Sequence, residues 1–383
     1  KIEQLGRNNR RSIVKTILLK QPLSRTAIAQ ETGLTGATVS RITRDLIAAG
    51  VVQESTQSTP NAGPGRRFVS LQINPQGGYL LGLSLNAFQQ IVTLTDLRNN
   101  PIQQVELKFK DLSDADAVIH SIISTMATLS QQCRKQGHRL IGGAIAITGA
   151  IDPRYGMVRF ASVLGWRDID LGARLEAALG IPFVVESLPN ALNLAETRFG
   201  VASDSRNVLL LNCALAIGAS LYLDDRLIRS TDYTAGVAGS VRYPFCDQGQ
   251  AASLDDVAGG RAILAGVAKT DPTKLDRSPD EMAKQLLQII NIAGHSAGIE
   301  RDCIQKAGHT LGNVVSLYAG LIHPKKIIFA GPLGSCPLYF AAASKALNAL
   351  CQADCVLPEL ISSQMSYQLA ARWLAIHQHL AGC

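Results

Sequence analysis

The chain has 383 residues, of which 46% are hydrophobic and 17% are charged, the composition of a soluble globular protein with two or three domains. The sequence lacks the run of about 18 apolar residues that a membrane span requires. The basic N-terminal segment also lacks the apolar centre of a signal peptide. These features predict a cytoplasmic protein with no membrane association.

The net charge of +7 is distributed unevenly along the chain. Residues 1–70 hold 11 Lys and Arg against 4 Asp and Glu, whereas residues 71–383 hold 26 of each class. All the excess positive charge therefore belongs to the N-terminal segment. A neutral body with a basic head is expected of a protein whose head neutralises DNA phosphates and releases their counterions.

The N-terminal segment predicts a helix-turn-helix after a first helix. Apolar residues at helical spacing place that first helix over about residues 8–20. In LSRTAIAQETGLTGATVSRITRDLIAAG, residues 23–50, Ser24 is suited to capping the next helix. Gly33 is suited to ending that helix in a left-handed conformation. Lys15 of the first helix is expected to contact DNA phosphates.

The third helix combines small side chains at its start with arginines further along. It is expected to begin at a capping residue, Thr35 or Thr38. Small side chains allow close approach to a major groove, and forked cations bind phosphates and guanine edges. An ordinary helical hairpin is the alternative. The expected DNA contacts are Ser24, Arg25, Thr35, Ala37, Thr38, Ser40, Arg41 and Arg44.

Two strands after the third helix would complete a winged helix. They are predicted at residues 51–52 and, by alternation, at residues 68–74. The polar tip between them ends in Gly-Pro-Gly-Arg-Arg, and such a thin segment can lay Arg66 or Arg67 into a narrow minor groove. A solvated tip that meets only phosphates is the alternative.

From Tyr79 onward, a pattern of strands and helices occurs twice. Three strands, an amphipathic helix and a further strand occupy residues 79–148. A second set of three strands follows at residues 207–230, and a long helix near residues 302–321 leads into a strand at residues 325–334. The duplication predicts two similar lobes with a cleft between them.

The cysteines and histidines indicate no metal site. None of the eight cysteines forms a CxxC pair, and nothing suggests a disulfide framework. Cys351 and Cys355 have the spacing of one helix face, where buried thiols are commoner than ligands. His377 and His379 are the one histidine pair with ligand-like spacing, and we expect them to be exposed tail residues.

The chain resembles the ROK family of bacterial sugar kinases and sugar-responsive repressors. The most specific stretches are LSRTAIAQETGLTGATVSRITRDLIAAGVV with GRRFVSLQINP, then ITGAIDPRYGMV, then LGNVVSLYAGLIHPKKIIFAGPLG. The resemblance implies an α/β fold in which a winged helix-turn-helix precedes a two-lobed, actin-like (ribonuclease-H-like) body. It also implies a repressor that leaves its operator when a small ligand or a partner protein binds the body.

Three domains follow from this resemblance. Residues 1–74 form the winged helix-turn-helix domain. Residues 75–187 form ROK lobe I, completed by the C-terminal helix at residues 365–383, and residues 188–364 form ROK lobe II.

The body departs from the kinase pattern at each catalytic segment. The acidic first phosphate turn is replaced by Ser84 and Asn86, and only Gly218 remains of the glycines in the second turn, ALAIGAS. Leu188 stands where the kinases carry their catalytic aspartate. Because leucine cannot accept a proton from a sugar hydroxyl, phosphoryl transfer should fail. We therefore expect no enzyme activity and no cofactor.

The sugar and zinc positions also differ from the family pattern. The family's sugar-contacting asparagine falls on Ser162, and the glutamate and histidine of GExGH fall on Ser240 and Tyr243. The family's zinc ligands are reduced to a lone Cys246, so no zinc is expected. A small effector would instead meet Ser162, Trp166, Asn190, Ser240, Arg242 and Tyr243, although each could equally be a packing residue.

Three hypotheses remain at this point. The first is a sequence-specific DNA-binding repressor of carbohydrate-related genes, controlled by a sugar-like effector or a partner protein. The second is a sugar kinase with a DNA-binding head, and the third is a ligand-independent regulator whose body is a dimerisation scaffold. A homodimer or homotetramer would present paired heads to an inverted-repeat operator.

Overall fold

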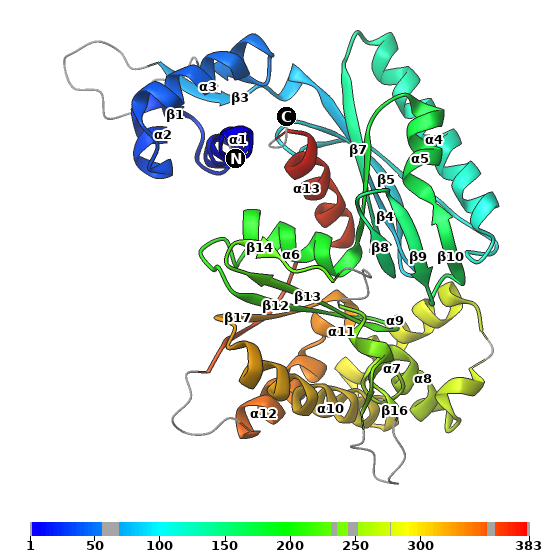
Figure 1. Ribbon diagram of the computed structural model, residues 1–383. Helices are drawn as coiled ribbons and strands as arrows, with labels where there is room; N and C mark the ends of the chain where they lie inside the picture. Colours follow the sequence, from blue (N-terminus) through cyan, green and yellow to red (C-terminus); the bar gives the residue numbers. More distant parts are fainter. Residues whose placement is uncertain are drawn as a thin grey trace.

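A computed structural model describes residues 2–55, 69–230, 236–243, 252–275, 277–350 and 357–380. It comprises a small N-terminal head and a larger body built on two five-stranded sheets (Figure 1). Arg66, Arg67, Cys246, Cys351 and Cys355 lie outside the described residues. No helix in the described ranges is both long and apolar enough to cross a membrane.

The head consists of three helices and a three-stranded sheet, the arrangement of a winged helix-turn-helix. Its elements are α1 Ile2–Lys20, β1 Leu23–Ser24, α2 Arg25–Thr32, α3 Gly36–Ala48, β2 Val52–Glu54 and β3 Ser70–Ile73. The strand order is β1-β3-β2, with both pairs antiparallel. The helix α1 begins earlier than predicted, and the two-residue strand β1 was not predicted because it is too short to show an alternation.

The caps that bound α2 and α3 agree with the sequence pattern. The Ser24 hydroxyl accepts a hydrogen bond from the Ala27 amide, and Gly33 ends α2 with a φ of 67°. Thr35 caps α3, so the helix begins at the first of the two candidate positions. A cap satisfies backbone N–H groups that have no partner within the helix, so these residues fix where the turn lies between the two helices.

The first body sheet has the strand order β11-β7-β4-β5-β6. The neighbours β4, β5 and β6 are antiparallel, whereas β7 is parallel to both β4 and β11. Helices α4 and α5 share an apolar core cluster with these strands. The elements are β4 Tyr79–Leu85, β5 Gln90–Asp96, β6 Pro101–Glu106, α4 Ala115–Lys135, β7 Leu140–Ile147, α5 Leu171–Leu179 and β11 Phe183–Ser187.

The second body sheet repeats this plan in the order β14-β13-β12-β17-β18. The neighbours β14, β13 and β12 are antiparallel, and β12, β17 and β18 are parallel, so this sheet has the same two sets of strands as the first. The predicted duplication is therefore confirmed. The elements are β12 Val208–Cys213, β13 Ile217–Leu223, β14 Arg226–Leu227, α7 Leu254–Ala258, α8 Gly260–Ala268, α9 Pro279–His295, α10 Ile299–Ile322, β17 Lys326–Ala330, α11 Gly331–Gly334, α12 Pro337–Leu350 and β18 Glu359–Ser362.

Two small sheets were not predicted from the sequence. One has the order β10-β9-β8, from β8 Ala150–Asp152, β9 Met157–Ala161 and β10 Trp166–Asp170. The other pairs β15 Arg242–Tyr243 with β16 Ala252–Ser253. Their strands are short and interrupted by turns, so no sustained alternation marks them.

Helices α6 Leu188–Phe199 and α13 Tyr367–His379 pack against each other, and α13 also lies on β4 and β7. Figure 1 shows both helices between the two sheets, with α13 next to the head. This packing makes one histidine prediction wrong. His379 is buried, and its Nε2 atom lies 2.8 Å from the Gly143 carbonyl oxygen, while His377 is partly buried. The domain boundaries at residues 74, 187 and 364 stay a prediction.

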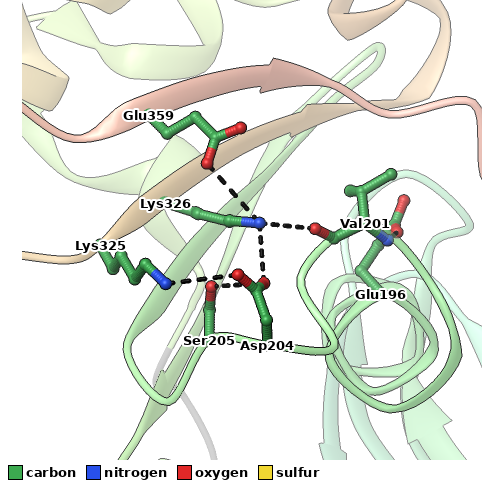
Figure 2. Close-up of polar contacts among 7 residues, drawn as sticks. All are labelled: Glu196, Val201, Asp204, Ser205, Lys325, Lys326 and Glu359. Carbon is green, nitrogen blue, oxygen red and sulfur yellow. Dashed lines mark hydrogen bonds and ion pairs between the residues drawn. The ribbon is translucent and has the colours of Figure 1, made fainter.

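The segment that follows α6 is fixed to the second sheet by a buried lysine. The Lys326 ammonium group donates to the Val201 carbonyl oxygen at 2.7 Å and to Asp204 Oδ1 at 2.8 Å. Glu359 of β18 lies 3.6 Å from the same nitrogen (Figure 2). These contacts join β17, β18 and the end of α6 into one unit.

Candidate nucleic-acid interface and body cavity

The exposed face of α3 carries the small and basic residues that the sequence pattern placed there. Ala37, Arg41 and Arg44 are exposed, and Ser40 is partly exposed. Arg41 lies 3.8 Å from Asp45 one turn later, a weak surface ion pair that leaves the guanidinium accessible. The apolar side of α3 is buried in the head, so the polar side is the one that a DNA groove could contact.

Other residues of the helix-turn-helix are engaged within the head. The Thr35 hydroxyl accepts from the Thr38 amide and lies 2.9 Å from the Thr38 hydroxyl. The Arg25 Nε atom donates to the Thr43 hydroxyl at 3.3 Å. With the cap formed by Ser24, these contacts position α2 and α3.

Part of the head's positive charge faces the body rather than solvent. Burial and the nearby charge of Arg198 lower the pKa of Lys15, while Asp225 opposes this effect. Arg11 and Lys15 also act on His377 of α13. Lys15 is thus partly buried near charged groups of the body. The predicted contact of Lys15 with DNA phosphates stays a prediction.

The body holds a cavity of about 360 Å³ where strand ends of both sheets meet. Three of the six predicted effector contacts line it, namely Ser162, Asn190 and Ser240. Other polar groups on its wall are Asn86, Thr148, Asn212, Arg229, Asp255 and Arg261. Cavities of this size and mixed polarity suit a small molecule.

A polar network joins the cavity wall to the start of α6. Arg229 and the buried Glu186 form an ion pair at 2.6 Å. Glu186 Oε1 accepts from the Asn190 side chain at 2.9 Å, and the Ser220 hydroxyl donates to Asn190 Oδ1 at 2.8 Å. Sequence reasoning did not find Glu186 or Arg229. The sequence feature that could have identified them is their position at strand ends, because the strand ends of the two sheets meet at the cleft.

Asp255 is a second carboxyl group on this wall. Its Oδ1 atom accepts from the Ile217 amide at 2.6 Å. Desolvation raises the pKa of Asp255 to about 6. The group can therefore accept or donate a hydrogen bond near neutral pH, which suits recognition of a hydroxyl-rich ligand.

Of the other three predicted effector contacts, the structure places Trp166 and Arg242 outside the cavity wall. Trp166 is 3% exposed, belongs to the core of the first sheet and donates from its indole N–H to the Leu112 carbonyl oxygen at 2.9 Å. Arg242 is exposed on β15. Tyr243 lies on the same strand, and its side chain is outside the described part of the chain. Trp166 is thus a packing residue.

The segments that correspond to the kinase turns line the cavity and also form packing contacts and local hydrogen bonds. The Asn86 side chain accepts from the amides of Phe88 and Gln89. A Cβ at Gly218 would lie 2.5 Å from the Pro189 ring, so this glycine permits the close approach of α6. Leu188, at the position of the kinase base, is 2% exposed and lines the cavity.

The described residues do not supply a metal site. Within the ranges given above, no group of three or more His, Cys, Asp or Glu side chains is arranged to hold an ion. Tyr243 offers no nitrogen or sulfur where the family has a zinc-binding histidine. The residues present thus do not match the family's zinc ligands.

Comparison with known proteins agrees with this architecture. The sequence pattern of the ROK family matches residues 92–372, and that of the winged helix-turn-helix DNA-binding family matches residues 7–53. The chain belongs to the ROK family. The xylose repressor of Caldicellulosiruptor bescii is 24% identical over 330 residues, which are 84% of this chain and 82% of the relative.

Solved structures of ROK proteins share the fold. A ROK family transcriptional regulator, a homolog of the E. coli MLC protein, matches with a TM-score of 0.77 at 23% identity over 99% of this chain and 97% of its own. A ROK family glucokinase from Streptomyces griseus, solved with glucose and AMPPNP, matches with a TM-score of 0.64 at 19% identity over 78% of this chain and 98% of its own. The regulator thus matches the head as well as the body.

Proposed function

We propose that this ROK protein is a sequence-specific DNA-binding repressor of carbohydrate-related genes, acting as a homodimer or homotetramer. The observation that carries the proposal is the exposed face of α3, with Ala37, Arg41 and Arg44 on a helix capped by Thr35. Ala37 allows close approach to base edges, and the two arginines supply charge and forked donors. The contacts proposed at the wing tip are Arg66 and Arg67.

A sugar-like small molecule bound in the body cavity would control the head. Ser162, Asn190, Ser240 and Asp255 offer hydrogen bonds to hydroxyl groups. The relative from Caldicellulosiruptor bescii is named a xylose repressor, which supports a carbohydrate ligand for this chain. Thermal unfolding against a panel of sugars, sugar phosphates and sugar acids tests this point, because a ligand of the folded state raises the melting temperature.

The chain is proposed not to be an enzyme. By its resemblance to the kinase pattern, the chain carries Leu188 at the position of the catalytic aspartate, and a leucine side chain cannot accept a proton. The likeness to a glucokinase extends to the fold alone, and fold does not determine chemistry. Sugar-dependent ATP turnover by the purified chain, abolished by Asp255→Ala, would instead favour a kinase.

Selection from a random pool of DNA duplexes tests the DNA-binding proposal. The full chain should enrich one inverted-repeat sequence, and the Arg41→Ala/Arg44→Ala variant should lose that enrichment. Absence of any enriched sequence, or the same sequence enriched by both proteins, would refute it.

A further inference from the structure

Helix α6 extends from the body cavity toward the head. Ser187, Leu188, Pro189 and Asn190, at its start, line the cavity. Residues 188–197 are all buried, so most of the helix is enclosed by protein. A helix packed on all sides moves with its neighbours rather than bending alone, because close-packed interiors transmit displacement.

The cavity end of α6 is tied to polar groups that a ligand would meet. Asn190 is held between Glu186 and Ser220, and Glu186 is paired with Arg229 of the cavity wall. The Asn193 side chain, one turn on, donates to the Ser220 carbonyl oxygen at 3.0 Å. A ligand that engages Arg229 or Asn190 therefore acts on the first turns of α6.

The far end of α6 contacts the β13–β14 turn and α13. The Arg198 guanidinium donates to the Asp225 carbonyl oxygen at 3.1 Å and lies 5.4 Å from the centre of the Tyr222 ring. Phe199 stacks on Trp373 of α13 with ring centres 3.9 Å apart. This end is therefore held on two sides.

The apolar core of the head is continuous with that of the body. Ile13, Val14 and Ile17 of α1 belong to one continuous apolar cluster with Leu192 and Ala195 of α6. Charged groups of α1, α6 and the β13–β14 turn act on one another near this cluster, and Asp225 is also ion-paired with Arg206 at 2.9 Å. The groups acting on one another there are Arg11, Lys15, Arg198, Asp225, Arg229 and His377.

Like charges held together oppose the docking of the head. Burial and the charges of Arg198, Arg11, Lys15 and Arg229 lower the pKa of His377 to about 3, so this ring is neutral at physiological pH. Asp225 is the anion that acts on Lys15. The head's position thus depends on a balance between apolar packing and repulsion, which a small shift of Arg198 can alter.

We propose that α6 transmits occupancy of the cavity to the head, and that Lys15, Arg198 and Asp225 are the positioning residues that set where the head sits on the body. The inference rests on the proposed function, since it gives the route by which an effector would move the DNA-reading helix. Two sites coupled through one element must influence each other reciprocally.

Hydrogen exchange of the full chain tests this route with neither DNA nor ligand. Asn190→Ala breaks the polar network at the cavity end of α6, whereas Ser240→Ala alters the same cavity wall without touching α6, because its hydroxyl donates to the Val237 carbonyl oxygen. Asn190→Ala should speed exchange in α1 and in residues 223–227 by about tenfold. Exchange in α4 should stay unchanged, which excludes global destabilisation.

Background variants identify the positioning residues. In a Lys15→Met chain, Asn190→Ala should add no further change in α1, whereas in a Lys20→Met chain its effect should persist, since Lys20 is exposed and pairs with Glu31. Equal α1 exchange in Asn190→Ala and Ser240→Ala, or an effect that survives Lys15→Met, overturns the proposal. If Asn190→Ala does not fold, Arg229→Gln takes its place with the same criteria.

These outcomes are independent of the proposed function. Duplex selection by the unmodified chain reports on DNA binding, and hydrogen exchange reports on the route through α6. A chain that selects a duplex but shows no change in α1 would keep the proposed function and lose this inference.

Discussion

Lys326 shows how one residue fixes the position of a segment. It is 6% exposed, and oxygen atoms of Val201, Asp204 and Glu359 surround its ammonium group (Figure 2). Lys326→Met would leave the Val201 carbonyl oxygen without this partner. Because an intramolecular hydrogen bond contributes about 0.5 to 1.5 kcal/mol net, and water can replace part of this one at the half-exposed Val201, we expect a loss of about 1 kcal/mol in urea unfolding at pH 7.

The ion pair between Lys326 and Asp204 predicts that the stability of the fold depends on pH. Hydrogen bonds from Lys326, Ser205 and Lys325 lower the pKa of Asp204 well below its usual value. A lowered carboxyl pKa stabilises the fold above the pKa of the unfolded chain, and this contribution is lost as pH falls toward the folded pKa. The difference between wild type and Lys326→Met should thus shrink below about pH 4. A difference that is constant with pH would contradict this role of the pair.

Asp255 predicts a change of stability with pH that has the opposite sign. Its raised pKa, about 6, means that the folded chain binds the proton more tightly than the unfolded chain. Stability then falls as pH rises from about 4 to about 6 and stays reduced above this window. Asp255→Asn should stabilise the chain by up to about 3 kcal/mol at pH 8 and by little at pH 4, measured by urea unfolding.

The control for this prediction is Asp224→Asn, at an exposed turn residue whose φ of 48° asparagine also adopts. It should show no such pH-dependent gain. An equal gain in both variants would assign the effect to net charge rather than to the desolvation of Asp255.

At the scale of elements, the sequence predicted those whose local signals are strong. Caps and helical spacing placed α2 and α3, and alternation placed β3. The β8–β10 sheet was not predicted, since short strands show little alternation. The orientation of α1 was not predicted either, because tertiary packing decides which partner an amphipathic face contacts. The cavity network was missed for the same reason, because Glu186 and Arg229 meet only in the folded chain.

The recognition helix carries its own prediction. Arg44→Ala should weaken binding to a selected duplex by about 1 to 3 kcal/mol and relax the preference at one base pair. Fluorescence anisotropy with single-base variants of the duplex measures both effects. Lys135→Ala, which removes one exposed charge from the body helix α4, is the matched control and should change neither. Equal losses in the two variants would reduce the role of Arg44 to bulk charge.

At the scale of the whole molecule, the duplicated sheets form a body that encloses a cavity, and the chain between β3 and β4 joins the winged head to it. The body has the ROK architecture, and at the positions of the kinase turns Gly218 permits the close approach of Pro189, while Asn86 forms local hydrogen bonds. The activity that this arrangement supports is DNA binding by the head.

The most direct test is a salt titration of the full chain on its selected duplex and on a scrambled duplex of the same length. We predict tighter binding to the selected duplex at every salt concentration. The logarithm of affinity should fall linearly with the logarithm of salt, by about 0.9 for each phosphate neutralised. Equal affinity for the two duplexes, or binding that does not depend on salt, would contradict the claim that this head reads DNA.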